Sequence, residues 1–188
     1  MANERIVTAI GGSYLVFHLG RTSDVARPTT HYLHSVRRGG GYLLPGEADR
    51  YFAVLPKLAE ALALAVEAGQ NRYDAIVCPP STRHDLILPY KAAILSRLPS
   101  AVDLSAAFER RPGTSAALAA GYSDVEAGLS IANTPGGLNG VTSILFIDDV
   151  FARGFTATAI ERLLKSRGCK HLRFDVACAL VADGVPDP

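Results

Sequence analysis

The stretch of sequence that decides the fold is Ser143-Ile-Leu-Phe-Ile-Asp-Asp-Val-Phe-Ala-Arg-Gly-Phe-Thr156. It begins with an unbroken apolar run, which is typical of a strand buried on both faces of a sheet. Two acidic residues, Asp148 and Asp149, come directly after that run, and Gly154 lies in the short segment before the next helical pattern. Because open α/β sheets bind ligands at the carboxyl ends of their strands, we expect a site at this point of the chain.

A βαβ unit surrounds this stretch. Its expected elements are a strand over residues 141–147, a helix over 156–167 that ends before Gly168, and a strand over 172–181. A crossover of this kind is right-handed and joins parallel strands. Upstream, an apolar run over 74–78 that stops at Pro79-Pro80 and a helix over 87–98 extend the same sheet. The expected fold class is therefore α/β, a parallel sheet flanked by helices.

The first seventy residues are expected to form an N-terminal strand and hood region. Strands over 5–9 and 13–19, joined at Gly11-Gly12, predict a hairpin, which is a candidate edge flap. A helix over 47–69 follows, and Pro56 is a point where it kinks or splits. We expect a single domain over residues 1–188, in which 1–70 form the hood and helix region and 71–182 form the core.

The segment 109–140 is rich in glycine and proline and predicts a long loop, which follows a short strand over 101–104. Residues 115–120 could still form a helical turn or two. Long loops inside compact domains are often functional lids, so we expect a lid in this part of the chain.

Composition limits the class of protein. The chain has 188 residues, of which 48% are hydrophobic and 20% are charged, and no apolar run is long enough for a membrane helix. The net charge of +1 argues against nucleic acid as a partner. The N-terminal sequence lacks the pattern of a secretory signal, so a cytoplasmic location is expected. The cysteines Cys78, Cys169 and Cys178 are odd in number and lack CxxC spacing, which predicts buried thiols instead of disulfides or a zinc site.

The loop after Asp149 has the chemistry of a phosphate site. A helix N-terminus offers unpaired backbone N–H groups and the positive end of a dipole. Gly154 lets the backbone approach a ligand closely, and Thr156 has a hydroxyl that can cap the helix or donate to the ligand. Asp148 and Asp149 accept hydrogen bonds when ionised and suit the vicinal hydroxyls of a sugar joined to that phosphate. The spacing suggests a ribose 5-phosphate ligand, although a solvated strand end that caps the next helix would also explain the aspartates.

Segment 143–156 resembles the signature of the type I phosphoribosyltransferases, in which an apolar strand precedes two acidic residues and a phosphate loop. The order and spacing of elements are similar to the family core over residues 74–182, and the layout is most similar to the bacterial competence-associated and amidophosphoribosyltransferase-like members. The resemblance implies that Asp148 and Asp149 bind the ribose hydroxyls of phosphoribosyl pyrophosphate (PRPP) and a metal ion. The residues implied to wrap the 5-phosphate are Ala152, Arg153, Gly154, Phe155 and Thr156.

The resemblance also implies a pyrophosphate loop after the first core strand. Here Arg83 would bind pyrophosphate oxygens as a catalytic residue, and Ser81 and Thr82 would add donors. Family members often have a cis peptide in this loop, and a cis bond before Pro79 or Pro80 would cost little. Arg83 could instead pair with Asp85 at the surface.

A mobile lid near residues 109–137 is a further implication of the resemblance. Its candidate ligands are Arg110, Arg111, Tyr122 and Ser123. The sequence alone favours ordinary exposed charges over ligands as the explanation of the two arginines. Because lids of this family are often completed by a neighbouring subunit, a homodimer is also implied.

The implied activity is that of a glycosyltransferase, specifically a Mg²⁺-dependent phosphoribosyltransferase. A nitrogen nucleophile, either a nucleobase or an amine, displaces pyrophosphate from PRPP through a transition state with oxocarbenium character. Mg²⁺ and Arg83 would neutralise the charge of the leaving group as it develops.

Arg153 and Phe155 depart from the family pattern, which has small residues at both positions. They could fill the pocket, or Arg153 could hold the phosphate with its planar fork. The alternative function is therefore a noncatalytic module that senses PRPP or another nucleotide containing ribose 5-phosphate and acts through a partner protein. A nucleotide kinase is excluded by the absence of a GxxxxGK[ST] loop. A phosphatase that uses the first aspartate lacks the chain length for its later motifs.

Overall fold

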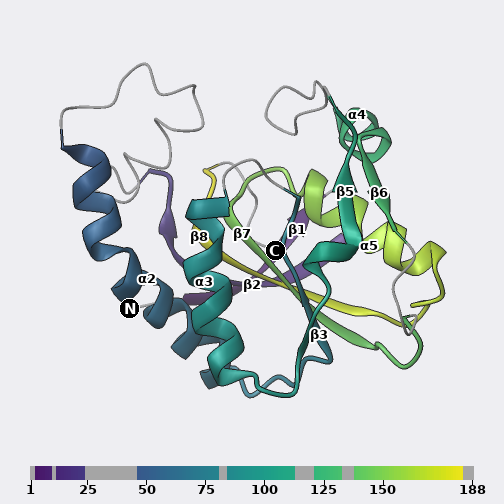
Figure 1. Cartoon of the computed structure of the whole chain (residues 1–188), viewed down its shortest axis with the longest axis horizontal. Coiled ribbons are helices and arrows are strands. Elements are labelled where there is room, and N and C mark those ends of the chain that lie inside the picture. Colours follow the sequence, from purple (N-terminus) through teal and green to yellow (C-terminus); the bar gives the residue numbers. More distant parts are fainter. Residues whose placement is uncertain are drawn as a thin grey trace.

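Six strands form the central sheet of the computed structural model, which describes residues 3–9, 12–23, 46–80, 84–112, 121–132 and 138–183 (Figure 1). Its strands are β1 (Asn3–Ala9), β2 (Gly12–Arg21), β3 (Ala75–Val77), β4 (Val102–Asp103), β7 (Ser143–Phe151) and β8 (Arg173–Val181). Their order in the sheet is β1-β2-β8-β7-β3-β4. Only the β1–β2 pair is antiparallel, so the predicted α/β class with a mostly parallel sheet is confirmed.

The βαβ unit is present, and its first strand is longer than the sequence predicts. Strand β7 pairs with β8 in parallel from Ser143 to Phe151, and α5 (Phe155–Ser166) connects them. The predicted strand end at residue 147 is therefore wrong, because β7 continues through Asp148 and Asp149. Pairing with β8 satisfies the backbone of β7 well beyond the end of its apolar run.

The N-terminal hairpin belongs to the main sheet. Strand β2 pairs in parallel with β8, with Val16 opposite Val176, and in antiparallel with β1, which forms the sheet edge. Its buried residues include Tyr14 and Phe17. The hairpin is therefore a structural part of the sheet instead of a flap attached to it.

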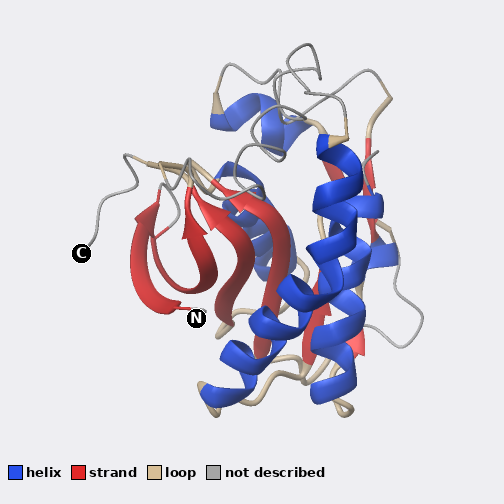
Figure 2. Ribbon diagram, turned by 90° about the vertical axis from the view of Figure 1, so that its left-hand side faces the viewer, coloured by secondary structure: helices blue, strands red, loops and turns tan. Residues whose placement is uncertain are grey.

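Helices cover both faces of the sheet (Figures 1 and 2). One hydrophobic cluster joins the sheet to α2 (Glu47–Ala68) and α3 (His84–Arg97), and the other joins it to α5. Along β7, Ile144 and Phe146 belong to the α5 cluster, whereas Leu145 and Ile147 belong to the α2 and α3 cluster. This alternation is the two-residue period of a strand buried on both faces.

Helix α2 continues through Pro56, which neither ends nor splits it. Tyr51, Leu55 and Leu62 of this helix are buried against the sheet. Arg97 at the end of α3 forms ion pairs with Glu60 and Glu67 of α2. The helix therefore persists because its apolar face is packed, which outweighs the lost backbone hydrogen bond at the proline.

The segment predicted as one long loop contains regular structure. Strands β5 (Phe108–Arg110) and β6 (Leu129–Ile131) form a separate antiparallel sheet, with α4 (Tyr122–Ala127) between them and a 3-10 helix (Ser105–Ala107) before them. Helix α4 and β6 both pack against α5. The prediction of a long loop over 109–140 is therefore wrong where β5, α4 and β6 lie. Residues 113–120 and 133–137, including the predicted helical turn, lie outside the described residues.

The three cysteines are buried and free, as the sequence predicted. Among the described residues, the longest helices are too short or too polar to cross a membrane.

Candidate functional site

Asp148 and Asp149 lie in the second half of β7, toward the carboxyl edge of the parallel strands. Asp148 is half-buried and its Oδ1 accepts a 2.8 Å hydrogen bond from the Asp149 N–H. Asp149 is only 8% exposed, and its Oδ1 accepts a 2.7 Å hydrogen bond from the Val150 N–H. The strand therefore carries two carboxylates at the edge where ligands bind in open α/β sheets.

The two carboxylates have different neighbours. Successive residues of a strand point to opposite faces of a sheet. The negative charge of Asp148 acts on Arg110 and on Cys78, whereas that of Asp149 acts on the Tyr90 hydroxyl of α3. Burial, assisted by the charge of Asp149, raises the pKa of Tyr90 to about 12. Asp148 thus shares its surroundings with the Arg110 cation.

Gly154 sets the geometry of the loop that follows β7. It is the N-cap of α5, with φ 71° and ψ 8°, and no side chain caps the helix. A Cβ at this position would lie 2.6 Å from the Ala9 Cβ and 3.1 Å from Phe151 Cζ. Glycine is therefore required here both by the left-handed backbone and by the packing.

Helix α5 presents its first N–H groups at the same edge. The first helical hydrogen bond runs from the Thr158 N–H to the Gly154 carbonyl at 2.9 Å. The N–H groups of Phe155, Thr156 and Ala157 precede that bond and have no acceptor within the helix. Thr156 lies in the first turn instead of capping it. The loop thus has the backbone donors of an anion site.

Arg153 and Phe155, the two departures from the family pattern, stack on each other. The Arg153 guanidinium lies 4.4 Å from the centre of the Phe155 ring, and Arg153 is exposed. Phe155 in turn packs edge-on against Tyr122 of α4 at 6.1 Å, and Arg162 lies over the Tyr122 ring at 4.8 Å. These contacts connect the loop to the segment between β5 and β6.

Arg110, the last residue of β5, interacts both with the segment after β3 and with Asp148 of β7. Its Nε donates a 3.1 Å hydrogen bond to the Pro80 carbonyl, and Asp148 interacts electrostatically with its charge. Burial lowers the pKa of the guanidinium, and Asp148 opposes that shift. Its Nη1 is buried and has no hydrogen-bond partner in the described parts of the chain. A buried N–H without an acceptor is costly, so this atom is suited to an acceptor from a ligand.

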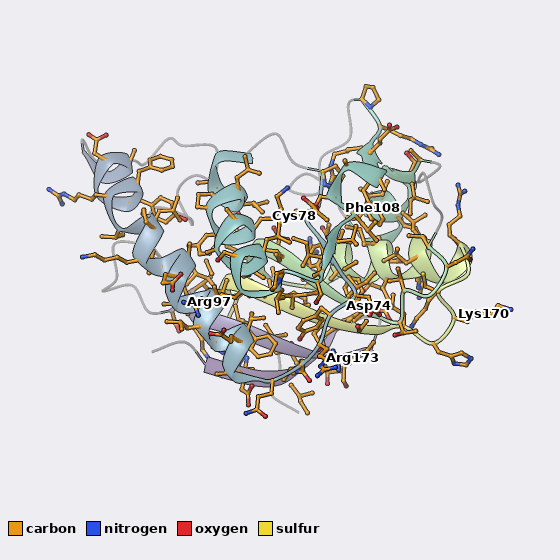
Figure 3. The ribbon with its side chains drawn as sticks, turned by 60° about the horizontal axis from the view of Figure 1, so that its bottom comes forward. Asp74, Cys78, Arg97, Phe108, Lys170 and Arg173 are labelled. Atoms are coloured by element: carbon orange, nitrogen blue, oxygen red, sulfur yellow. The ribbon has the colours of Figure 1, made fainter. Side chains whose placement is uncertain are left out.

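Cys78 directly follows β3, and Figure 3 shows it at the opposite end of that strand from Asp74. Its N–H donates to Ser105 Oγ at 2.9 Å, and burial raises the pKa of its thiol to about 12. The peptide bonds before Pro79 and Pro80 are trans, so the predicted cis bond is wrong. Ser81, Thr82 and Arg83 lie outside the described residues.

No protein-family model matches the chain, and a search of curated proteins finds no significant match. Several solved structures do resemble its fold. The xanthine-guanine-hypoxanthine phosphoribosyltransferase of Helicobacter pylori is 18% identical, with a TM-score of 0.42 over 72% of this chain and 84% of that chain. A hypoxanthine phosphoribosyltransferase of Staphylococcus aureus is 11% identical, with a TM-score of 0.41 over 71% and 66% of the two chains.

A third similar structure is a hypothetical protein from Neisseria gonorrhoeae with bound ppGpp. It is 16% identical, with a TM-score of 0.40 over 71% of this chain and 72% of that chain. Two of the three structures are phosphoribosyltransferases, the family that the sequence resembles. At these identities and TM-scores, the similarity assigns neither a substrate nor a reaction to this chain.

The sequence identified some site residues without ranking them. Arg110 and Arg111 look alike in the sequence, and only the pairing of β5 with β6 brings Arg110 to Pro80 and Asp148. Tyr122 contacts Phe155, whereas Ser123 is exposed. The contact of Ala9 with Gly154 carries no local signal in the sequence, because these residues meet only through the folding of the N-terminal hairpin.

Proposed function

We propose that the chain is a phosphoribosyltransferase that binds PRPP and Mg²⁺ and transfers the phosphoribosyl group to a nitrogen nucleophile, either a nucleobase or an amine. One observation carries the proposal. The N-terminus of α5 and the carboxylate of Asp148 lie at the carboxyl edge of the same sheet, and the half-buried guanidinium of Arg110 interacts electrostatically with Asp148. This arrangement combines donors for an anion with a carboxylate that accepts hydrogen bonds from sugar hydroxyls.

The 5-phosphate would bind at the loop formed by residues 152–156. The N–H groups that precede the Thr158 bond are available as donors, and the helix dipole favours negative charge there. The exposed position of Arg153 adds a cation near this loop, and its stacking on Phe155 keeps its side chain at the surface. This geometry supports a loop that still binds phosphate despite the two larger side chains.

The ribose and the leaving group would bind next to it. Asp148 suits the ribose hydroxyls. Asp149 donates its backbone N–H to the Asp148 carboxylate, and its own carboxylate lies near Tyr90 of α3. Arg110 Nη1 would donate to a pyrophosphate oxygen, as would Ser81, Thr82 and Arg83 on grounds of sequence. The proposed reaction forms a bond between nitrogen and C1 while the C1–O bond breaks and its electron pair leaves with pyrophosphate. The nitrogen releases its proton.

Mg²⁺ fits the donors that the chain supplies. Asp148 and Asp149 are hard oxygen ligands, and Mg²⁺ commonly takes one or two carboxylates together with substrate phosphates and water. No group of three or more acidic, histidine or cysteine side chains that could hold a metal occurs within the described ranges. When bound, Mg²⁺ would neutralise charge on the pyrophosphate.

Calorimetric titration with PRPP and Mg²⁺ tests this proposal. We expect Asp148→Asn to weaken PRPP binding about tenfold or more, since it removes a charged acceptor and metal ligand. Asp49→Asn, which removes a carboxylate on the exposed surface of α2, is the matched control and should bind like the wild type. No binding by the wild type, or equal binding by Asp148→Asn, would contradict the proposal. Binding without pyrophosphate release in a screen of nucleobases and amines would favour the noncatalytic alternative.

A further inference from the structure

The N-terminal hairpin reaches the candidate phosphate loop. Ala9, the last residue of β1, is so close to Gly154 that a Cβ on the glycine would lie 2.6 Å from the alanine Cβ. Phe151, whose Cζ would lie 3.1 Å from the same Cβ, is buried in the hydrophobic cluster to which Ala9 packs. The end of the hairpin therefore packs against the loop at Gly154.

Tyr14 of β2 anchors the hairpin to α5. Its hydroxyl donates to Glu161 Oε2 at 2.7 Å and lies 3.1 Å from Thr158 Oγ1. The three side chains are buried, and the Tyr14 ring packs edge-on against Phe151 at 6.1 Å. Lys165 donates to Glu161 Oε1 at 2.5 Å and balances its charge. A buried hydroxyl with two partners holds one strand in a defined position relative to a helix.

We infer that Tyr14 is a positioning residue for the loop of residues 152–156. Through its bonds to the first and second turns of α5, it places Ala9 against Gly154 and fixes the conformation in which the loop presents its N–H groups. The N-terminal hairpin is thus a working part of the phosphate site, although it is the segment farthest from that site in the sequence. The interpretation of the loop as a phosphate site rests on the proposed function, whereas the inference that the hairpin fixes the conformation of the loop does not.

Hydrogen exchange and ligand titration of Tyr14→Phe test the inference. The variant removes only the hydroxyl, so the ring contacts with Phe151 and Phe174 remain. Loss of one buried hydrogen bond predicts about tenfold faster amide exchange in the first turns of α5, starting at Thr158, and PRPP binding weaker by about the same factor. Ala9→Gly, which removes the methyl group against Gly154 without affecting Tyr14, should change both quantities in the same direction.

The chain offers a closely matched control in Tyr73→Phe. Tyr73 is also buried, and its hydroxyl donates to the buried carboxylate of Asp175 at 2.8 Å. That pair lies at the opposite end of the sheet, near the start of β3 and β8. Tyr73→Phe should therefore lower global stability to a similar extent while α5 exchange and PRPP affinity stay as in the wild type.

The outcomes separate the inference from the proposed function. Equal effects of Tyr14→Phe and Tyr73→Phe on α5 exchange would overturn the inference, because Tyr14 would then contribute only to general stability. Unchanged exchange at Thr158 in Tyr14→Phe would overturn it as well. A wild type that shows no PRPP binding would instead refute the proposed function, and the exchange experiment would still decide whether the hairpin positions the loop.

Discussion

At the scale of single residues, Gly154 tolerates no side chain, because its backbone is left-handed and Ala9 lies against it. We expect Gly154→Ala to lower the free energy of unfolding by about 2–5 kcal/mol, which combines the cost of a left-handed alanine with overpacking against Ala9. Denaturant titration measures this loss. The same substitution should also weaken PRPP binding, because the loop must shift to relieve the contact.

Gly46 provides an unusually close comparison for that prediction. It is the N-cap of α2, with φ 74° and ψ 5°, and a Cβ there would meet nothing within 4 Å. Gly46→Ala should therefore cost only the backbone term, about 1–2 kcal/mol. If both variants lose the same stability, the contact between Ala9 and Gly154 contributes nothing measurable.

Arg110 is the second residue whose substitution should have a specific effect, in this case on ligand binding. Arg110→Met keeps much of the side-chain length and removes the cation that interacts with Asp148. We expect PRPP binding to weaken about tenfold or more, while binding of ribose 5-phosphate, which lacks the pyrophosphate group, changes little. Titration of both ligands checks the difference. Arg167→Met is the control, because Arg167 also donates to a backbone carbonyl, that of Ile131, but lies at the far end of α5.

At the scale of elements, Asp74 joins the starts of β3 and β7. Its Oδ2 accepts from the N–H and hydroxyl of Thr142 at 2.8 and 2.9 Å, and from the N–H and hydroxyl of Ser143, both at 3.0 Å. The hydrogen bond from the Thr142 backbone is the main cause that lowers the pKa of Asp74 below its ordinary value of 3.8. This junction lies at the end of the sheet opposite the candidate site.

A pH dependence of stability follows from that lowered pKa. A carboxyl whose pKa is lower in the folded state stabilises the protein above its unfolded pKa, and that contribution is lost as pH falls through the folded value. The difference in unfolding free energy between wild type and Asp74→Asn should therefore be constant near neutral pH and shrink below about pH 4. Denaturant titrations across that range measure it, with Asp49→Asn as the control for loss of one negative charge. A difference that stays constant down to pH 2 would contradict this reading.

At the scale of the whole molecule, the N-terminal third and the core share their hydrophobic clusters. Tyr14 packs with Phe151 and Phe174, and Tyr51 of α2 belongs to the cluster that contains Ile147 and Ala177. We expect one cooperative unfolding transition, in which helix content from circular dichroism and tyrosine fluorescence change together. The chain has no tryptophan, and Tyr14, Tyr51, Tyr73 and Tyr90 are buried members of these clusters, so tyrosine fluorescence is sensitive to their packing. Tyrosine and helix signals that change at different denaturant concentrations would contradict a single cooperative transition.

Local sequence patterns determined the central part of this protein. The apolar run before Asp148, the glycine before α5 and the helical pattern after it predict a βαβ unit with a site at its carboxyl edge, and the structure contains that unit. These features could be predicted because each depends on residues close together in the chain: apolar periodicity defines the strand and helix, and glycine permits the turn between them.

Tertiary structure alone decided the rest, because it depends on contacts between distant segments. Pairing with β8 keeps Asp148 and Asp149 inside β7, and their alternation directs one toward Arg110 and the other toward Tyr90. The antiparallel pairing of β5 and β6 selects Arg110 over Arg111. The bond from Tyr14 to Glu161 spans 147 residues of sequence. No local propensity encodes such pairs, since their free energy is gained only when the sheet and its helices have assembled.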